Sequence, residues 1–166
     1  MKIGILSDTH GNLSTTRSAA RQMAAAGVGA VFHCGDIGDV EVLAELAMVF
    51  QPLEVPVYVV FGNVDLFSED WKFFPSNFGV ELLGRFGEVE LDGMKVAILH
   101  SDDRRRFRKT IERGGYDLVL SGHSHEIHDY QVGATRCVNP GSAGRGSPDC
   151  FAILDLSSGM LDWFNA

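Results

Sequence analysis

Five short apolar runs in this chain end in residues that carry carboxylate, amide or imidazole groups. Runs of this length and composition predict buried β-strands. In open α/β sheets, ligands bind beyond the carboxyl ends of the strands, so the residues that follow each run are the candidate functional groups. They are Asp8, His10, Asp36, Asn63, His100, His123 and His125. The pattern therefore predicts a fold in which these side chains converge from five strand ends.

The first half of the chain alternates predicted strands and helices. Strands are expected at residues 2–7, 30–33 and 57–61, and helices at residues 12–26 and 39–50. Gly27 and Pro52 stand where these helices should stop. The segment 57–61 is β-branched and aromatic, which is typical of a buried strand.

The second half is predicted to be mostly β-structure. Strands are expected at residues 81–91, 94–100, 117–121, 126–132, 135–138, 151–156 and 160–164, with one helix at 102–113. Asp92-Gly93 is a hairpin-turn signal. Strand–helix alternation followed by antiparallel strands predicts an α/β sandwich of two sheets covered by helices.

Residues 66–79, between these halves, are aromatic and have no clean period. They predict an ordered loop or a broken helix, in the position of a lid or a packing flap. The aromatic side chains are Phe67, Trp71, Phe73, Phe74 and Phe78. Burial of several of them in the core is favoured over stacking on a nucleobase or packing on a second subunit, because aromatic side chains contribute large buried areas.

The length of 166 residues predicts a single domain over residues 1–166. A chain of this size buries about 70% of its extended-chain surface. A hydrophobic content of 45% therefore supplies a core without a structural metal or disulfides. Any bound metal is expected to be functional.

The formal net charge of −8 disfavours capture of a long nucleic acid, whereas a small phosphate ligand stays compatible with it. Three cysteines without CxxC spacing argue against a disulfide scaffold or a thiolate zinc site. The N-terminal segment does not resemble a signal peptide, and no apolar stretch reaches the roughly 18 residues that span a membrane. We therefore predict a cytoplasmic protein without membrane association; a homo-oligomer stays open.

The ligand types at the strand ends indicate a metal centre. Carboxylates, imidazoles and an amide oxygen suit borderline divalent ions such as Mn²⁺, Fe²⁺ or Zn²⁺. Seven candidate ligands are too many for one ion. Two ions about 3.5–4 Å apart need a bridging carboxylate, for which Asp36 is the natural choice. Glycines before Asp36, Asn63 and His123 remove side chains where the backbone must approach such ions.

Each candidate also has a simpler interpretation. A single Asp after a strand is more often a helix cap, which applies to Asp8, Asp36 or Asp39 taken alone. A single His at a strand end is more often solvated or hydrogen-bonded. Only the joint occurrence at five strand ends favours metal binding. Cys34, two residues before Asp36, is expected to be a buried thiol.

These motifs resemble those of the calcineurin-like metallophosphoesterase superfamily, in the same order and across the whole chain. The matching motifs are Asp8-Thr9-His10, Gly35-Asp36, Gly62-Asn63-Val64-Asp65, His100 and Gly122-His123-Ser124-His125. The small size and the sequence Asn139-Pro140-Gly141-Ser142 resemble the compact single-domain phosphodiesterase branch of that superfamily.

The resemblance implies a four-layer α/β-β/α sandwich of two mixed sheets that binds two divalent metal ions. One ion would be held by Asp8, His10, Asp36 and His125, and the other by Asp36, Asn63, His100 and His123. Asp65 would support these ligands, and the implied catalytic residues are Asp36, Asn63 and Asp65. A hydroxide bridging the ions would attack phosphorus in line. Mn²⁺ is the expected ion, with Fe²⁺, Zn²⁺, Ni²⁺ or Mg²⁺ as alternatives.

Two positions depart from the family pattern. Many relatives carry a His where this chain has Val64, which cannot donate a proton to the leaving oxygen. General acid catalysis is typically worth about 10²–10⁴-fold, so we expect a preference for diesters or activated leaving groups. Ser101 and Asp102 follow His100 where many relatives have glycine; capping of the next helix by Asp102 and Asp103 is favoured over a role in substrate selection.

Substrate-binding residues are less clearly indicated. Arg104-Arg105-Arg106, Arg108 and Lys109 are the main basic concentration in the chain, and a solvated helix face is favoured over a phosphate-guiding role. Arg104 or Arg105, near the expected helix start, is the candidate from this run, with Arg104 favoured. Asn139 and Ser142 are candidates from a turn-rich loop.

We therefore predict a two-metal phosphodiesterase acting on a small or locally exposed phosphodiester. The alternatives are a phosphomonoesterase of the same fold and a non-catalytic metal-binding scaffold resembling the retromer subunit. A dinucleotide-binding module is disfavoured, because Gly27-x-Gly29 and Gly35-x-x-Gly38 do not form a G-x-G-x-x-G motif after a first strand.

Overall fold

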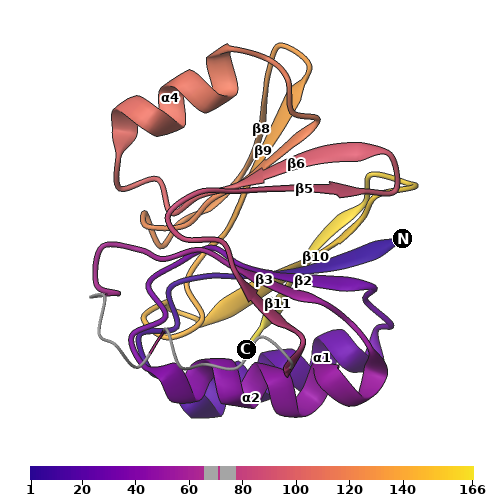
Figure 1. Cartoon of the computed structure of the whole chain (residues 1–166), viewed down its shortest axis with the longest axis vertical. Helices are drawn as coiled ribbons and strands as arrows, with labels where there is room; N and C mark the ends of the chain where they lie inside the picture. The colour runs from indigo at the N-terminus through magenta and orange to yellow at the C-terminus, as the bar shows by residue number, and fades with distance from the viewer. Residues whose placement is uncertain (66–70, 72–77) are drawn as a thin grey trace.

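The computed structural model describes residues 1–65, 71 and 78–166. Two sheets lie face to face, with helices on the outer face of each (Figure 1). The elements of the first half are β1 (Lys2–Leu6), α1 (Leu13–Ala25), β2 (Ala30–His33), α2 (Val40–Phe50), η1 (Gln51–Leu53), β3 (Val57–Val59) and β4 (Val80–Leu82). Those of the second half are β5 (Gly87–Leu91), β6 (Met94–Ile98), α4 (Arg104–Glu112), β7 (Leu118–Leu120), β8 (Ile127–Val132), β9 (Thr135–Pro140), β10 (Cys150–Asp155) and β11 (Leu161–Asn165).

Both sheets are mixed. The six-stranded sheet has the order β11-β10-β1-β2-β3-β4, in which β1, β2, β3 and β4 are parallel and β10 and β11 are antiparallel to their neighbours. The five-stranded sheet has the order β5-β6-β7-β9-β8. Its central pairs β6–β7 and β7–β9 are parallel and its outer pairs β5–β6 and β8–β9 are antiparallel, so both sheets are mixed, as the resemblance implies.

Alternation along the strands produces the four layers. Ile3 and Ile5 of β1 point into the apolar layer between the sheets, while Leu6 packs under the helices. In the same way Ile98 of β6 faces the other sheet and Ala97 faces α4. This period-2 pattern is what a strand covered on both faces requires. The predicted α/β-β/α sandwich is confirmed.

The helices begin at side-chain caps. Asn12 accepts a hydrogen bond from the backbone N–H of Thr15, and Asp39 accepts one from Glu41. Asp103 caps α4 by accepting from the backbone N–H of Arg106 at 3.0 Å. Each cap satisfies a donor that the first helical turn leaves unpaired.

The segment predicted as one strand at residues 81–91 is two strands in different sheets. β4 pairs with β3 in the first sheet, and β5 pairs with β6 in the second. Gly84, with a φ of +72°, lies in the connection between them, where the chain passes from one sheet to the other. The Asp92-Gly93 hairpin is confirmed, since Leu91 pairs with Met94 across it.

The aromatic segment is described only in part. Trp71 is 7% exposed and meets the ring of Phe61 edge-on with 5.6 Å between centroids, so it belongs to the core. Phe78 is 40% exposed. Phe67, Phe73 and Phe74, and the prediction of a lid there, lie outside the described residues. Among the described residues, no helix combines the length and hydropathy needed to cross a bilayer.

Candidate metal centre

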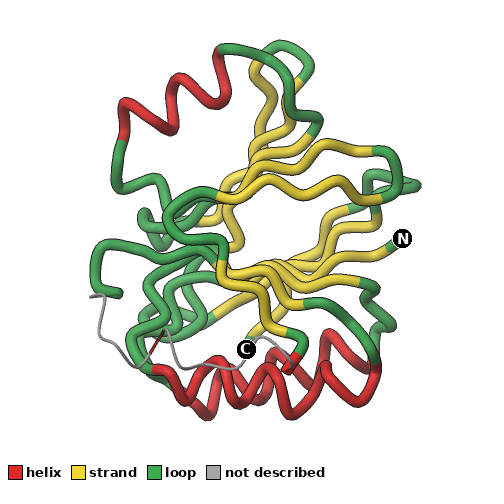
Figure 2. The backbone as a smooth tube through the Cα atoms, viewed as in Figure 1, coloured by secondary structure: helices red, strands yellow, loops and turns green. Residues whose placement is uncertain are grey.

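The candidate ligands lie on loops at one edge of the sandwich. The loops after β1, β2 and β3 in one sheet meet those after β6 and β7 in the other (Figure 2). They meet because these strands are parallel within each sheet, so their carboxyl ends share an edge. The sequence prediction that five strand ends converge is thus met by the topology.

Two carboxylates occupy the floor of the site. Asp8 is fully buried, and its Oδ2 accepts hydrogen bonds from the Ser7 hydroxyl at 2.5 Å and from the backbone N–H of His123 at 3.0 Å. Asp36 is 3% exposed, and its Oδ1 accepts from the backbone N–H of Val64 at 3.1 Å. Burial opposes ionisation of Asp36, but the adjacent His100 imidazole and the hydrogen bond from the Val64 backbone hold its pKa at about 2.

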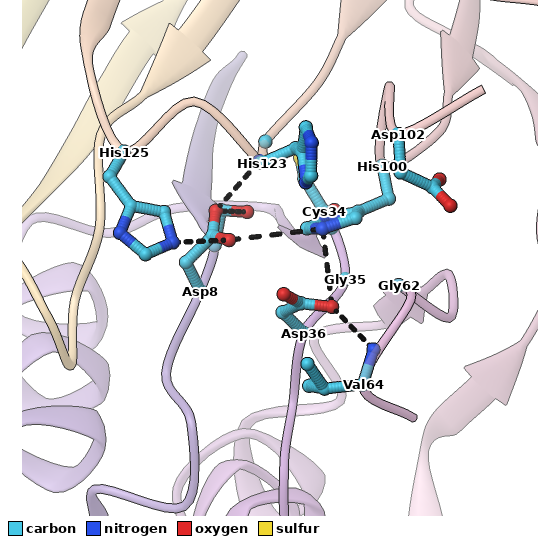
Figure 3. A network of polar contacts seen from close by, with 12 residues as sticks. Asp8, Cys34, Gly35, Asp36, Gly62, Val64, His100, Asp102, His123 and His125 are labelled. Atoms are coloured by element: carbon cyan, nitrogen blue, oxygen red, sulfur yellow. Dashed lines mark hydrogen bonds and ion pairs between the residues drawn. The ribbon is translucent and has the colours of Figure 1, made fainter. Parts of the chain in front are cut away.

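The imidazole of His100 is buried with its Nε2 turned toward these carboxylates (Figure 3). Its Nδ1 lies 2.9 Å from the carbonyl oxygen of Cys34, which can only accept, so Nδ1 carries the proton and Nε2 is free to act as a ligand. Nε2 is 3.2 Å from Oδ1 of Asp36 and 3.9 Å from Oδ1 of Asp8. Burial opposes protonation of His100, yet the two carboxylates raise its pKa above the ordinary value.

His10 and His125 form the other half of the cluster. Their Nε2 atoms are 3.4 Å apart, and Nε2 of His125 is 3.2 Å from Oδ1 of Asp8. Nε2 of His10 is 3.7 Å from Oδ2 of Asp36. Burial, with a smaller contribution from the nearby Arg145 guanidinium, lowers the pKa of His10, which keeps its ring nitrogen available to a cation.

The two remaining candidates lie at the rim. His123 is exposed, and its ring meets that of His100 edge-on with 5.1 Å between centroids. Asn63 is exposed beside Val64, whose backbone contacts Asp36. Both are therefore on the solvent side of the buried carboxylates.

Unpartnered buried atoms show that the cluster fits metal ions. Oδ1 of Asp8 and Nε2 of His100 are buried without a hydrogen-bond partner among the described residues. Leaving such atoms unpaired is costly unless another group contacts them. Ligand atoms of Asp8, His10 and His125 lie within 4.8 Å of one another, as do those of Asp8, Asp36 and His100. Asp8 belongs to both groups, and Asp36 reaches His10 as well as His100, so both carboxylates lie between the two halves.

Backbone strain is concentrated in these loops. Among the described residues, eight non-glycine residues have positive φ, and six of them belong to the site: Asp8, His10, Asp36, Ser101, His123 and His125. The left-handed region is unfavourable for L-residues and persists where surrounding contacts enforce it. The site geometry is therefore held by the fold rather than by local preference.

Two glycines let the loops approach each other. A Cβ at Gly62 would lie 2.0 Å from Oδ1 of Asp36, and one at Gly122 would lie 2.0 Å from Oγ of Ser7 and 2.7 Å from Oδ2 of Asp8. Either side chain would displace a carboxylate. This close approach accounts for the glycines that precede Asn63 and His123.

Asp65 and the two loop candidates support the ligand loops. Asp65 is 5% exposed and accepts backbone N–H bonds from Gly38 at 2.9 Å and Gly62 at 2.7 Å, which ties the Asp36 loop to the Asn63 loop. Asn139 donates to the carbonyl of Gly122, and Ser142 donates to the carbonyl of Asp8. Both are buried. These bonds favour a role in holding the loops over direct contact with a substrate.

Sequence reasoning missed His33. This side chain is fully buried at the end of β2, where Nδ1 accepts from the backbone N–H of Gly35 and Nε2 donates to Thr9. Thr9 in turn donates to the carbonyl of Ile37. Burial lowers the pKa of His33 to about 3, so it is a neutral link between the Asp8 and Asp36 loops. A histidine in the last position of an otherwise apolar strand was the available signal.

Arg85 was also missed. Its guanidinium donates to the carbonyl of Gly62 at 3.1 Å and pairs with Asp102, thereby joining the loop after β3 to the loop after β6. Capping is thus confirmed for Asp103, whereas the carboxylate of Asp102 is engaged by Arg85. Arg104 is exposed at the first residue of α4. The buried thiol predicted at Cys34 is confirmed, and burial raises its pKa.

A model of the calcineurin-like phosphoesterase superfamily domain matches residues 1–159. A phosphodiesterase of Methanocaldococcus jannaschii is 33% identical over 142 residues, covering 85% of this chain and 83% of that protein.

Solved structures agree with the fold. The structure of an archaeal phosphodiesterase superposes with a TM-score of 0.86 at 29% identity, covering 100% of both chains. Vacuolar protein sorting 29 of Cryptosporidium parvum superposes with a TM-score of 0.69 at 18% identity, covering 99% of this chain and 96% of that one. The second likeness concerns the fold alone.

Proposed function

The chain belongs to the calcineurin-like phosphoesterase superfamily, and on that premise we propose that it is a two-metal phosphodiesterase acting on a small or locally exposed phosphodiester. The observation that carries this proposal is the pair of unpartnered buried atoms, Oδ1 of Asp8 and Nε2 of His100, within one cluster of carboxylates and imidazoles. A dedicated cation site explains why these groups are buried together.

The proposed ligand sets follow the family pattern. Asp8, His10, Asp36 and His125 would hold one ion, and Asp36, Asn63, His100 and His123 the other. Mn²⁺ is the proposed activating ion, because carboxylate, amide and imidazole ligands together suit it. Bound ions of this kind supply a nucleophile from water at neutral pH and neutralise charge on the phosphoryl oxygens.

The chain's own residues prepare the site. Ser7 and the His123 backbone fix the Asp8 carboxylate, and the Val64 backbone fixes that of Asp36. The Cys34 carbonyl fixes the ring of His100 with Nε2 facing the centre. These partners lock the ligand orientations before substrate arrives, which is the outer support that metal sites require.

The leaving group receives no proton from position 64. Val64 is 40% exposed at the rim and has no ionisable group. We therefore propose that diesters with good leaving groups react faster than monoesters with the same leaving group. Faster hydrolysis of p-nitrophenyl phosphate than of bis-p-nitrophenyl phosphate would favour a phosphomonoesterase instead.

The test is hydrolysis of bis-p-nitrophenyl phosphate with Mn²⁺, together with metal content per chain, for the wild type and Asp36→Asn. We expect Asp36→Asn to lose bound metal and most activity. Asp39→Asn is the matched control, because it makes the same change at an exposed helix cap that asparagine also fills. Equal rates for the wild type and Asp36→Asn would overturn the proposal. Metal binding without hydrolysis of any diester would favour a scaffold.

A further inference from the structure

The cations of this acidic protein are concentrated on α4 and its C-terminal cap. Of the 14 Lys and Arg residues, six lie between residues 104 and 113, and Glu112 is the one acid in that segment. Glu112 pairs with Arg108 on the helix surface. The local charge is therefore strongly positive, although the net charge of the chain is −8.

Four of these cations line one groove. Arg105, Arg106, Lys109 and Arg113 face a hollow of about 590 Å³ whose far side is formed by Phe86 and Tyr116. Arg105, Lys109 and Arg113 recur every four residues, so they form a row with steps of about 6 Å along the helix axis. Arg106 lies over the ring of Phe86, 5.1 Å from its centroid.

Among the described residues, the groove cations have no acidic ion-pair partner. Within the described part of the chain, the arginine ion pairs involve Arg17, Arg85, Arg108 and Arg136, and none involves a groove cation. Asp103 also lines the groove, but its carboxylate is engaged in capping α4. An unpaired row of cations suits a ligand that brings several negative charges.

The groove continues toward the metal centre. Asp103 and Arg106 also line a smaller cavity of about 70 Å³, whose other walls include His100, Ser101 and Arg85. The loop that carries His100 leads directly into α4 (Figure 1). A single extended ligand in the groove can therefore extend toward the loop that carries His100.

We propose that the α4 groove binds the flanking phosphates of a short single-stranded oligonucleotide whose scissile phosphodiester lies at the metal centre. The inference rests on the proposed function and specifies its substrate. A linear polyanion matches a row of cations better than a single phosphate does, and a nucleic acid strand carries a cleavable diester at each repeat. A membrane surface would contact the groove without entering the cavity beside His100.

Binding and hydrolysis are tested separately, so that failure of the groove and failure of the proposed function are distinguishable. Anisotropy of fluorescein-labelled decathymidylate is measured in EDTA, where no hydrolysis intervenes. The double variant Arg105→Gln/Lys109→Gln is expected to bind about tenfold more weakly than the wild type, with a salt dependence shallower by about 1.4, because each lost phosphate contact removes about 0.7 from the slope. Glutamine preserves helix propensity at these exposed positions.

The control Arg21→Gln/Arg108→Gln removes the same charge. Arg21 lies on α1 on the opposite face of the sandwich, and Arg108 is the paired arginine of α4. This control is expected to bind decathymidylate like the wild type. With Mn²⁺, the groove variant should lose about tenfold more kcat/KM on decathymidylate than on bis-p-nitrophenyl phosphate.

Equal affinities of the two double variants would overturn the proposal. So would absence of decathymidylate binding by the wild type, or binding to phosphatidylserine vesicles in place of the oligonucleotide. Salt-dependent binding by the wild type without hydrolysis of any diester would leave the groove in place and reject the proposed function.

Discussion

The two sides of the candidate metal centre are built differently. The six-stranded sheet supplies the carboxylates of Asp8 and Asp36, which are 0% and 3% exposed. The five-stranded sheet supplies imidazoles, of which His100 is buried, whereas His123 is exposed and the His125 side chain is 32% exposed. The carboxylates thus lie deep in the fold, and two of the imidazoles lie at the more exposed rim.

The helices explain this difference. α1 and α2 bury apolar faces on the six-stranded sheet, with Met23, Leu43 and Leu46 among the buried side chains. In α4 only Thr110 is buried, and the apolar side chains Phe107 and Ile111 pack on the five-stranded sheet while partly exposed. The carboxylates therefore rest on the more densely covered layer, and the face beside α4 is left charged and open. We expect substitutions on the carboxylate side to have the larger effects.

The largest expected effect separates the two sides directly. Asp8→Asn should lower kcat/KM for bis-p-nitrophenyl phosphate by about 10³-fold. The reason is that Asp8 belongs to both clusters of neighbouring ligand atoms, the one with His10 and His125 and the one with Asp36 and His100. His125→Asn should lower kcat/KM by about 10–100-fold, since His125 belongs to only one of the two clusters. In EDTA, Asp8→Asn should unfold with a free energy equal to or above that of the wild type, because it removes a buried carboxylate whose Oδ1 has no hydrogen-bond partner among the described residues. A larger loss for His125→Asn would contradict the comparison.

Metal addition should stabilise the wild type through the same carboxylates. Binding to the folded state alone contributes about 2.7 kcal/mol at a ligand concentration 100-fold above Kd, which raises Tm by about 5–10 °C for a chain of this length. Calorimetry with Mn²⁺ and after EDTA treatment measures the difference. Asp8→Asn is expected to lose most of this shift. An unchanged wild-type Tm at saturating Mn²⁺ would count against a preformed centre.

Substitution of Asp65 tests whether a residue that only holds the loops of the candidate ligands also matters for activity. Asp65→Asn replaces an acceptor of two backbone N–H groups, and we expect a loss of about 10–100-fold in kcat/KM and of about 1–3 kcal/mol in the free energy of unfolding. Asp155→Asn is the control, since Asp155 accepts a backbone N–H bond from Ser157 far from the site. Wild-type activity of Asp65→Asn would remove Asp65 from the catalytic set.

The smallest effect near neutral pH is the pH dependence due to His33. Burial lowers the pKa of His33 from 6.5 to about 3, so below pH 6.5 the unfolded chain takes up a proton that the folded chain does not. Stability from this group is therefore full above the unfolded pKa and falls by about 1.4 kcal/mol per pH unit below it. Urea unfolding of the wild type and His33→Gln should show a shallower acid slope for the variant. In the folded wild type, the imidazole ¹⁵N chemical shifts of His33 should remain those of a neutral ring at pH values near the ordinary histidine pKa.

The sequence was informative where its signals were local. Asn12 and Asp39 immediately precede the helical segments that they cap, and α1 and α2 were predicted within one residue of their observed bounds. Asp92-Gly93 fixed a hairpin because both residues adopt positive φ. The crossing near Gly84 was missed, because a weak alternation over residues 81–91 carries no information about which sheet each half joins.

What the sequence determined by itself is the set of chemical groups and the strand ends from which they project, because period-2 burial and turn residues depend on neighbours along the chain. The tertiary structure decided which of those groups bring their oxygen and nitrogen atoms close to one another. Asp8, His100 and His125 are separated by long stretches of chain, and their distances depend on how two twisted sheets pack. The roles of His33 and Arg85 were decided at the same level, since each acts by joining two loops that no sequence pattern connects.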